Sequence, residues 1–119
     1  MRRHALLVIA IGFLLGGTSA SAQPAAETLA HNRNPLLHLA QQLGRAAGDA
    51  EYCGYDEEVV EAFIARSMAR LAKETQDQAL LAGSRIEFNN HAAHGRASGP
   101  DEGCDAFALT FAAIKRQLD

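Results

Sequence analysis

The chain has 119 residues and a formal net charge of −3, with 14 acidic against 11 basic side chains. This acidic balance argues against nucleic acid as a partner, because nucleic-acid-binding domains carry a basic face. It argues equally against electrostatic docking to an anionic membrane. The length is sufficient for one small domain and not for two.

The first 22 residues have the three parts of a secretory signal peptide. A short basic start with Arg2 and Arg3 precedes an uncharged apolar run over residues 5–15, and small residues then continue to Ala22. The apolar run is shorter than the roughly 20 residues that span a bilayer as a helix. A retained N-terminal anchor is the competing interpretation. Cleavage after Ala22 predicts a protein that is secreted or exported to the periplasm.

Cleavage would leave 97 of the 119 residues and remove Arg2 and Arg3, so the formal net charge would fall from −3 to −5. Residues 23–33 are polar and show no hydrophobic period, and we expect a flexible N-terminal segment there. A single helical domain is expected over residues 34–119. No second apolar run is long enough to span a membrane, so we expect no membrane contact after cleavage.

The first helix is predicted to begin at Pro35, because proline fits the first helical position and Asn34 is a good N-cap. Its apolar residues recur at three- and four-residue steps and share one face. They are Leu36, Leu39, Ala40, Leu43, Ala46, Ala47, Ala50 and Cys53. Gly44 and Gly48 would let a neighbouring helix approach closely. Gly54 would end the helix in the left-handed conformation.

Asp56 is predicted to cap a second helix, whose acidic first turn is stabilised by the helix dipole. The inner stripe of this helix consists of Val60, Phe63, Ile64, Ser67, Met68 and Leu71. Thr75 and Gln78 match a capping box, which would start a third helix at that point. The alternative is one long bent helix through this stretch, and we favour the break.

A third helix is expected over residues 76–94, with a turn at residues 97–100 and a fourth helix from Asp101 and Glu102. The third helix is predicted to pack through Ala79, Ala82, Gly83, Ile86, Asn90 and Ala93. The core face of the fourth helix would consist of Cys104, Phe107, Ala108, Phe111, Ile114 and Leu118. No segment alternates as a strand does, so the predicted fold is all-α: a small antiparallel bundle of three to four helices.

Cys53 and Cys104 are expected to form a buried structural disulfide that clamps the first helix to the last. Two thiols in a small exported domain usually pair. Their separation of 51 residues would remove roughly 4 kcal/mol of unfolded-chain entropy. A redox-active pair is the alternative, but it normally needs a Cys-x-x-Cys spacing or cationic neighbours. Acidic residues flank both of these cysteines.

His91 and His94 are candidate metal ligands, because their i, i+3 spacing places them on one side of a helix turn. A zinc site needs a third and a fourth ligand, so solvated surface histidines are the alternative. Asn89, Asn90 and His91 are also a candidate polar contact patch, with a buried amide at Asn90. The acidic run from Asp56 lacks the ligand spacing of a calcium loop. No cofactor is expected.

No serine, threonine or cysteine stands in a pattern typical of a catalytic nucleophile, and we expect that the protein is not an enzyme. The layout of leader, short helical domain and two widely spaced cysteines is similar to that of periplasmic acid-stress chaperones. It is also similar to that of the small helical immunity proteins of secreted toxins. The similarity concerns architecture and transfers no site residue.

We therefore expect a protein-binding module, of the inhibitor or immunity type, that docks an envelope or periplasmic protein. The first alternative is an acid-stress chaperone that opens to expose its helices, and the second is metal binding through His91 and His94. The core is expected to be rich in alanine and therefore to bury little apolar surface per residue. Because buried apolar surface stabilises a fold by about 25 cal/mol per Å², such a core gives limited stability. A homodimer in which a second copy completes one helix face is also expected.

Overall fold

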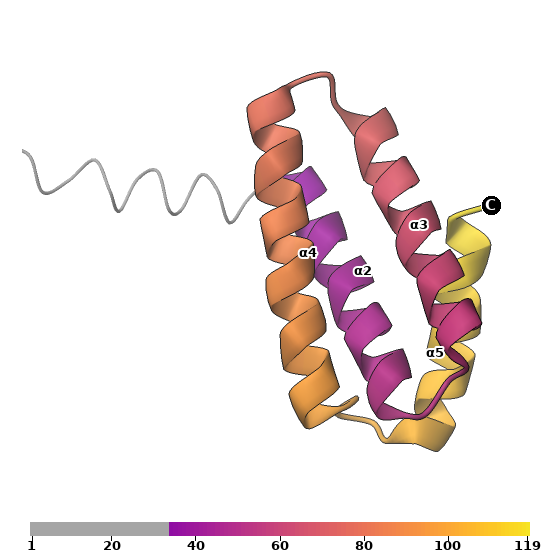
Figure 1. The fold of residues 1–119 in the computed structure, drawn as a ribbon. Helices are drawn as coiled ribbons and strands as arrows, with labels where there is room; N and C mark the ends of the chain where they lie inside the picture. The colour runs from indigo at the N-terminus through magenta and orange to yellow at the C-terminus, as the bar shows by residue number, and fades with distance from the viewer. Residues whose placement is uncertain (1–33) are drawn as a thin grey trace, which may run out of the picture.

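The computed structural model describes residues 34–119, which form four α-helices of alternating direction (Figure 1). They are α2 (Pro35–Tyr52), α3 (Glu57–Glu74), α4 (Gln78–Ser98) and α5 (Cys104–Gln117). The described part of the chain contains no strand, and the predicted all-α bundle clamped by one disulfide is confirmed. The predicted signal peptide over residues 1–22 and the segment 23–33 lie outside the described residues. None of the four helices has the length and apolar character needed to cross a membrane.

The ends of α2 follow the predicted pattern. The Asn34 side chain accepts a hydrogen bond of 2.9 Å from the backbone N–H of Leu36, and Pro35 occupies the first turn. Gly54 has a φ of 78°, and the next residue, Tyr55, donates its backbone N–H to the carbonyl of Ala50 at 3.0 Å. The glycine therefore reverses the chain directly after α2, as a left-handed helix stop does.

The predicted break between the second and third helices is confirmed, but its cap differs from the predicted one. Thr75 has an extended backbone, and Asp77 is the N-cap of α4. The Asp77 carboxylate accepts from the backbone N–H groups of Ala79 at 3.0 Å and Leu80 at 3.1 Å. The Thr75 hydroxyl accepts from the backbone of Asp77 instead. The carboxylate satisfies two orphan amides, which explains why it replaces the hydroxyl as the cap.

Helix α2 occupies the middle of the bundle and packs most extensively against α4. The two helices run in the same direction in Figure 1. A Cβ atom at Gly44 would overlap the backbone of Phe88, and one at Gly48 would overlap the carbonyl oxygen of Ala92. The close approach predicted from these two glycines is therefore confirmed, and α4 is the helix that makes it.

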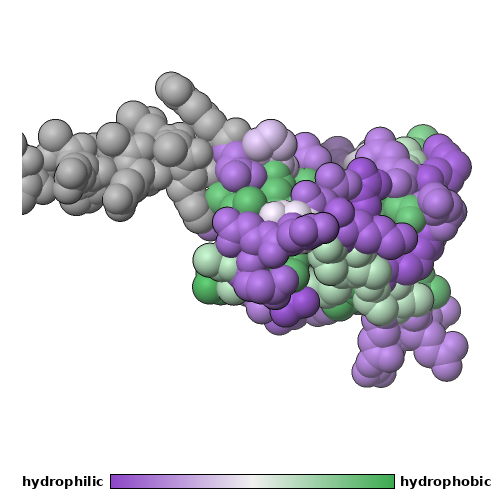
Figure 2. Space-filling view, turned by 90° about the horizontal axis from the view of Figure 1, so that it is seen from above, coloured by the Kyte–Doolittle hydropathy of each residue, from purple (hydrophilic) through white to green (hydrophobic). Residues whose placement is uncertain are grey.

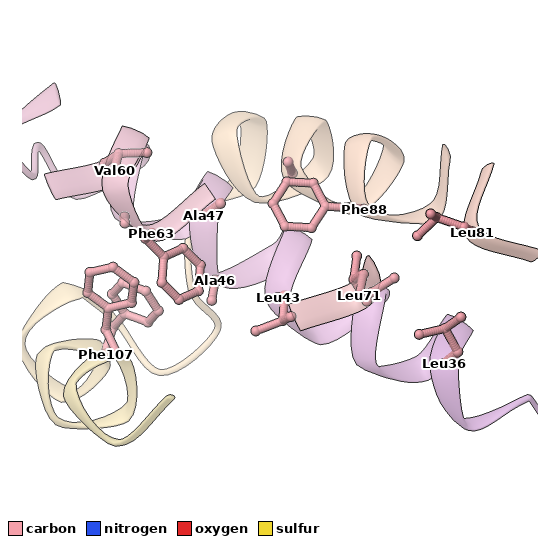
Figure 3. Packing of buried hydrophobic residues seen from close by; sticks show 14 residues of the cluster. Leu36, Leu43, Ala46, Ala47, Val60, Phe63, Leu71, Leu81, Phe88 and Phe107 are labelled. Atoms are coloured by element: carbon pink, nitrogen blue, oxygen red, sulfur yellow. The ribbon is translucent and has the colours of Figure 1, made fainter. Parts of the chain in front are cut away.

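Large apolar side chains fill the space between the helices. The predicted stripe of α3 is confirmed, since Val60, Phe63, Ser67 and Leu71 are buried. Figure 3 shows Val60 and Phe63 close to Phe107 of α5 at one end of the core, and Phe88 of α4 over α2. The core thus runs along all four helices, with its aromatic end beside the start of α5.

The predicted packing face of α4 is wrong. Ile86 is 60 % exposed and Asn90 is also exposed. The buried positions are instead Leu81, Ser84, Phe88, Ala92 and Gly95. Apolar residues are distributed around all sides of this helix. The side that packs is the one on which the backbone of Phe88 and Ala92 lies against Gly44 and Gly48 of α2. The amide of Asn90 is therefore not a buried polar group.

The fourth helix begins later than predicted. Residues 99–103 form a connection, and α5 starts at Cys104 after Gly103, which has a φ of 86°. Phe107 and Phe111 are buried as predicted, but Ala108 and Cys104 are exposed. Only one narrow side of α5 reaches the core, because this helix lies at the edge of the bundle.

Candidate functional site

The disulfide Cys53–Cys104 joins the residue that follows α2 to the first residue of α5, with the two Cα atoms 5.6 Å apart. It is not buried as predicted, because Cys104 is exposed and Cys53 is half-buried. Cys104 lies one helical turn before Phe107, the first residue of α5 that reaches the core. The disulfide therefore holds the first turn of α5 in place, and it does so at the surface of the bundle.

An aromatic cluster near the disulfide joins α5 to α3 and to the connection between α2 and α3. The ring of Tyr55 meets Phe111 edge-on with centroids 5.0 Å apart, and Phe63 of α3 meets the same ring at 4.9 Å. Phe107 stacks on Phe111 at 5.4 Å. Each edge-on pair of this kind stabilises the fold by about 0.5–1.5 kcal/mol, in addition to the effect of burying its apolar surface. Tyr55 was absent from the predicted core.

Two arginines of α3 hold the far end of α5. Arg66 donates to the carbonyl of Lys115 at 3.1 Å and pairs with the carboxylate of Asp119. Arg70 donates to the carbonyl of Gln117 at 3.2 Å. Carbonyls at a helix C-terminus have no partner within the helix, so these contacts cap α5 and orient it along α3.

Arg45 of α2 is the centre of a polar network that joins α2 to the connection between α4 and α5. Its guanidinium donates to the Asp49 carboxylate at 2.9 Å and to the carbonyl of Gly99 at 2.7 Å, and it lies 3.5 Å from the carboxylate of Asp101. Asp49 is only 6 % exposed. Arg45 therefore compensates a buried carboxylate and also holds the connection between α4 and α5 against α2.

The hydrogen bond to Asp49 is the main cause that raises the pKa of Arg45, and the nearby charge of Asp101 adds to it. A base with a raised pKa stabilises the folded state fully below the pKa of the unpaired group, and loses this contribution only as pH rises through the raised value. The contribution of Arg45 is therefore complete at neutral pH.

A groove of about 540 Å³ lies between α2 and α5, and we call it the α2–α5 groove. Its apolar lining consists of Leu39, Leu43, Ala46, Phe107 and Ile114. Its polar lining consists of Gln41, Gln42, Arg45, Asp49, His91, Glu102, Thr110 and Gln117. The ionisable residues cluster towards the disulfide end, and the rest of the rim is made of amides and one hydroxyl. The groove thus offers an apolar floor inside a rim of four ionisable and four uncharged polar side chains.

The predicted histidine pair lies beside this groove. His91 lines it and also shares a shallow hollow with Arg45, Asn90 and His94. The Nε2 atom of His91 lies 3.8 Å from the carboxylate of Glu87, which makes an ion pair only when the imidazole is protonated. Within residues 34–119 no group of three or more His, Cys, Asp or Glu side chains could hold a metal ion.

Of the predicted contact patch, Asn90 and His91 share this hollow, while Asn89 is exposed and lines neither the hollow nor the groove. Arg45 and the groove glutamines are not among the site residues predicted from the sequence. The i, i+4 spacing of Arg45 and Asp49 is a signal that could have indicated an ion pair.

The surface as a whole mixes polar and apolar residues. Figure 2 shows hydrophilic side chains interrupted by several hydrophobic patches at the end of the bundle where α2 begins. No protein-family model, curated protein or solved structure matches the chain. The function is therefore inferred from the geometry of the described residues.

Proposed function

We propose that the protein is a non-enzymatic binding module that holds an amphipathic helix of another exported protein in the α2–α5 groove. The observation that carries this proposal is the composition of the groove, which has leucine, alanine, isoleucine and phenylalanine on its floor and a rim in which three glutamines and one threonine make up half of the polar side chains. Its volume of about 540 Å³ falls in the range of about 300–1,000 Å³ that is usual for binding pockets. Several apolar side chains would fit.

A helix is the occupant that the surroundings favour. A bound strand gains its affinity by adding to an exposed sheet edge, whereas a helix places its apolar face in a hydrophobic groove. The described residues offer no strand to which another could be added. On the uncharged part of the rim, Gln42 of α2 and Gln117 of α5 would accept the polar flanks of a bound helix without requiring a particular charge.

The chemistry of the groove also supports binding over catalysis. Thr110 is the only hydroxyl-bearing side chain among the described residues that line it, and it makes no hydrogen bond to a base. An activated nucleophile requires such a base within hydrogen-bond reach. The disulfide and the leader-like residues 1–22 support an oxidising compartment, the periplasm or the cell exterior.

Site-specific photo-cross-linking tests the proposal in cells that make the full chain. A photoreactive residue at Gln117 should give a discrete adduct with one protein, and the cross-linked site should lie on an amphipathic helix of that protein. The same probe at Glu58, which is exposed on α3 and away from the groove, is the control. Equal adducts from both positions, or an adduct to an extended segment, would contradict the proposal.

An acid-stress chaperone is the second candidate, and the ion pairs between elements favour it. Glu51 pairs with Arg96, and Asp119 pairs with Arg66. Each of these contacts joins two helices or a helix and the C-terminus, and each loses its charge attraction when the carboxylate is protonated. A chaperone would therefore loosen in acid and expose the core.

Circular dichroism and light scattering from pH 7 to pH 3 separate the two candidates. A binding module should keep its helical signal between pH 7 and pH 4, whereas an acid-activated chaperone should lose packing and gain exposed apolar surface near pH 3.

A further inference from the structure

Helix α5 carries a second stripe on the side away from the core. Asp105, Leu109, Ala112 and Arg116 follow one another at steps of four, three and four residues, and this spacing places them on one face of a helix. We call these four residues the α5 stripe. Leu109 is 79 % exposed, more than any other large hydrophobic residue in the described part of the chain. Asp105, Leu109 and Arg116 are exposed, and Ala112 is half-buried.

The two ends of the α5 stripe carry opposite charges. Asp105 lies in the first turn of α5 and Arg116 in the last turn. Both are exposed, and neither makes an ion pair within residues 34–119. Each one complements the dipole of its own helix, but their side chains remain available to another molecule.

Two copies of the α5 stripe are complementary to each other when the two helices run antiparallel. The centre of the stripe lies midway between Asp105 and Arg116, and this is also the midpoint between Leu109 and Ala112. An antiparallel copy of α5 would therefore place an aspartate opposite an arginine at both ends. In the middle it would place each leucine opposite an alanine, so that a large side chain meets a small one. A two-fold dimer interface needs this kind of self-complementarity.

We propose that a second copy of the chain docks on the α5 stripe, with the two α5 helices antiparallel. Asp105 pairs with the partner's Arg116, and Leu109 packs on the partner's Ala112. The stripe covers eleven residue steps, which correspond to about 16 Å of helix at about 1.5 Å per residue. Such a contact belongs to the small interfaces that support weak association, so the dimer is concentration-dependent. The charge pairs chiefly select the antiparallel direction.

This inference is independent of the proposed function. The α5 residues that line the α2–α5 groove, such as Thr110 and Gln117, do not belong to the α5 stripe. The dimer therefore carries two grooves, one on each copy, and binds two identical partner helices. A failure of dimerisation would leave binding in the groove untouched, and a failure of groove binding would leave the dimer untouched.

Sedimentation of charge-reversed variants tests the dimer. Asp105→Arg places like charges opposite each other in its own homodimer, and so does Arg116→Asp. When the two variants are mixed in equal amounts, every charge pair in the mixed dimer is again of opposite sign. We expect the wild type to shift from monomer to dimer between low and high micromolar concentration. Each variant alone should stay monomeric in that range, and the mixture should recover the dimer.

Leu109→Glu is the second variant, and it should also be monomeric. Ala65→Arg, an exposed position on α3, is the control that should dimerise like the wild type. Circular dichroism confirms that each variant is folded before it is compared. A monomeric wild type at high micromolar concentration would overturn the proposal. A dimer that persists in folded Leu109→Glu, or a mixture of the two charge variants that stays monomeric, would also overturn it.

Discussion

The carbonyl oxygen of Ala92 in α4 occupies the space that a Cβ atom at Gly48 in α2 would need. This relationship explains why α2 and α4 form the closest pair in the bundle although they are not consecutive helices. The two backbones come together where α2 has no side chain, with Gly44 against the backbone of Phe88 and Gly48 against that of Ala92. The position of α4 therefore depends on the glycines of α2.

Gly48→Ala should destabilise the protein strongly, because the new methyl group would force the two backbones apart. Overpacking of a well-packed core typically costs about 1–3 kcal/mol, and we expect the upper part of this range. Gly83→Ala is the matched control, since the nearest atom to its Cβ would be the Leu37 side chain at 4.0 Å. That substitution should be neutral or stabilise by up to about 1 kcal/mol, because alanine favours the helix. Urea unfolding measures both, and equal effects would contradict the packing described.

Arg45→Met should destabilise the protein because it leaves the buried carboxylate of Asp49 and the carbonyl of Gly99 without their donor. An unsatisfied buried group costs about 1–3 kcal/mol and more when it is charged. Asp49→Asn keeps an acceptor for Arg45 and should cost less. The free energies of unfolding of both variants and of the double variant form a thermodynamic cycle. Additive losses would show that Arg45 does not act through Asp49.

Cys53→Ser, or reduction of the disulfide, should lower the free energy of unfolding by about 2–5 kcal/mol. The effect should appear first in α5, which reaches the core through Phe107 and Phe111 and is held at its start by Cys104. Hydrogen exchange should therefore accelerate in α5 before it accelerates in α2 or α4. A melting temperature that does not change after reduction would contradict a structural role for the bond.

The inner faces of α2 and α3 could be predicted from the sequence because each helix has one dominant apolar stripe. In α2 even the role of Gly44 and Gly48 could be predicted, since two small residues one turn apart leave room for a neighbour. The ends of α2 were also predictable, because Asn34 and Gly54 act through contacts within a few residues. These features depend on local physics alone.

The packing face of α4 could not be predicted in the same way. Apolar residues surround this helix, and both Ile86 and Phe88 lie on stripes that could have been buried. The choice between them depends on which residues fit against Gly44 and Gly48, which is a property of the pair of helices. The α2–α5 groove and the contact from Arg45 to Gly99 depend on tertiary structure for the same reason.

Binding of another protein in the α2–α5 groove is tested most directly by the binding constant of the cross-linked partner. Thr110→Arg places a long charged side chain in the groove at an exposed position, so the fold should be preserved. Ala65→Arg makes a similar change on α3, outside the groove. Calorimetric titration should show at least about a tenfold weaker affinity for Thr110→Arg, which corresponds to about 1.4 kcal/mol, and no change for Ala65→Arg. Equal affinities for the two variants would contradict binding in the groove.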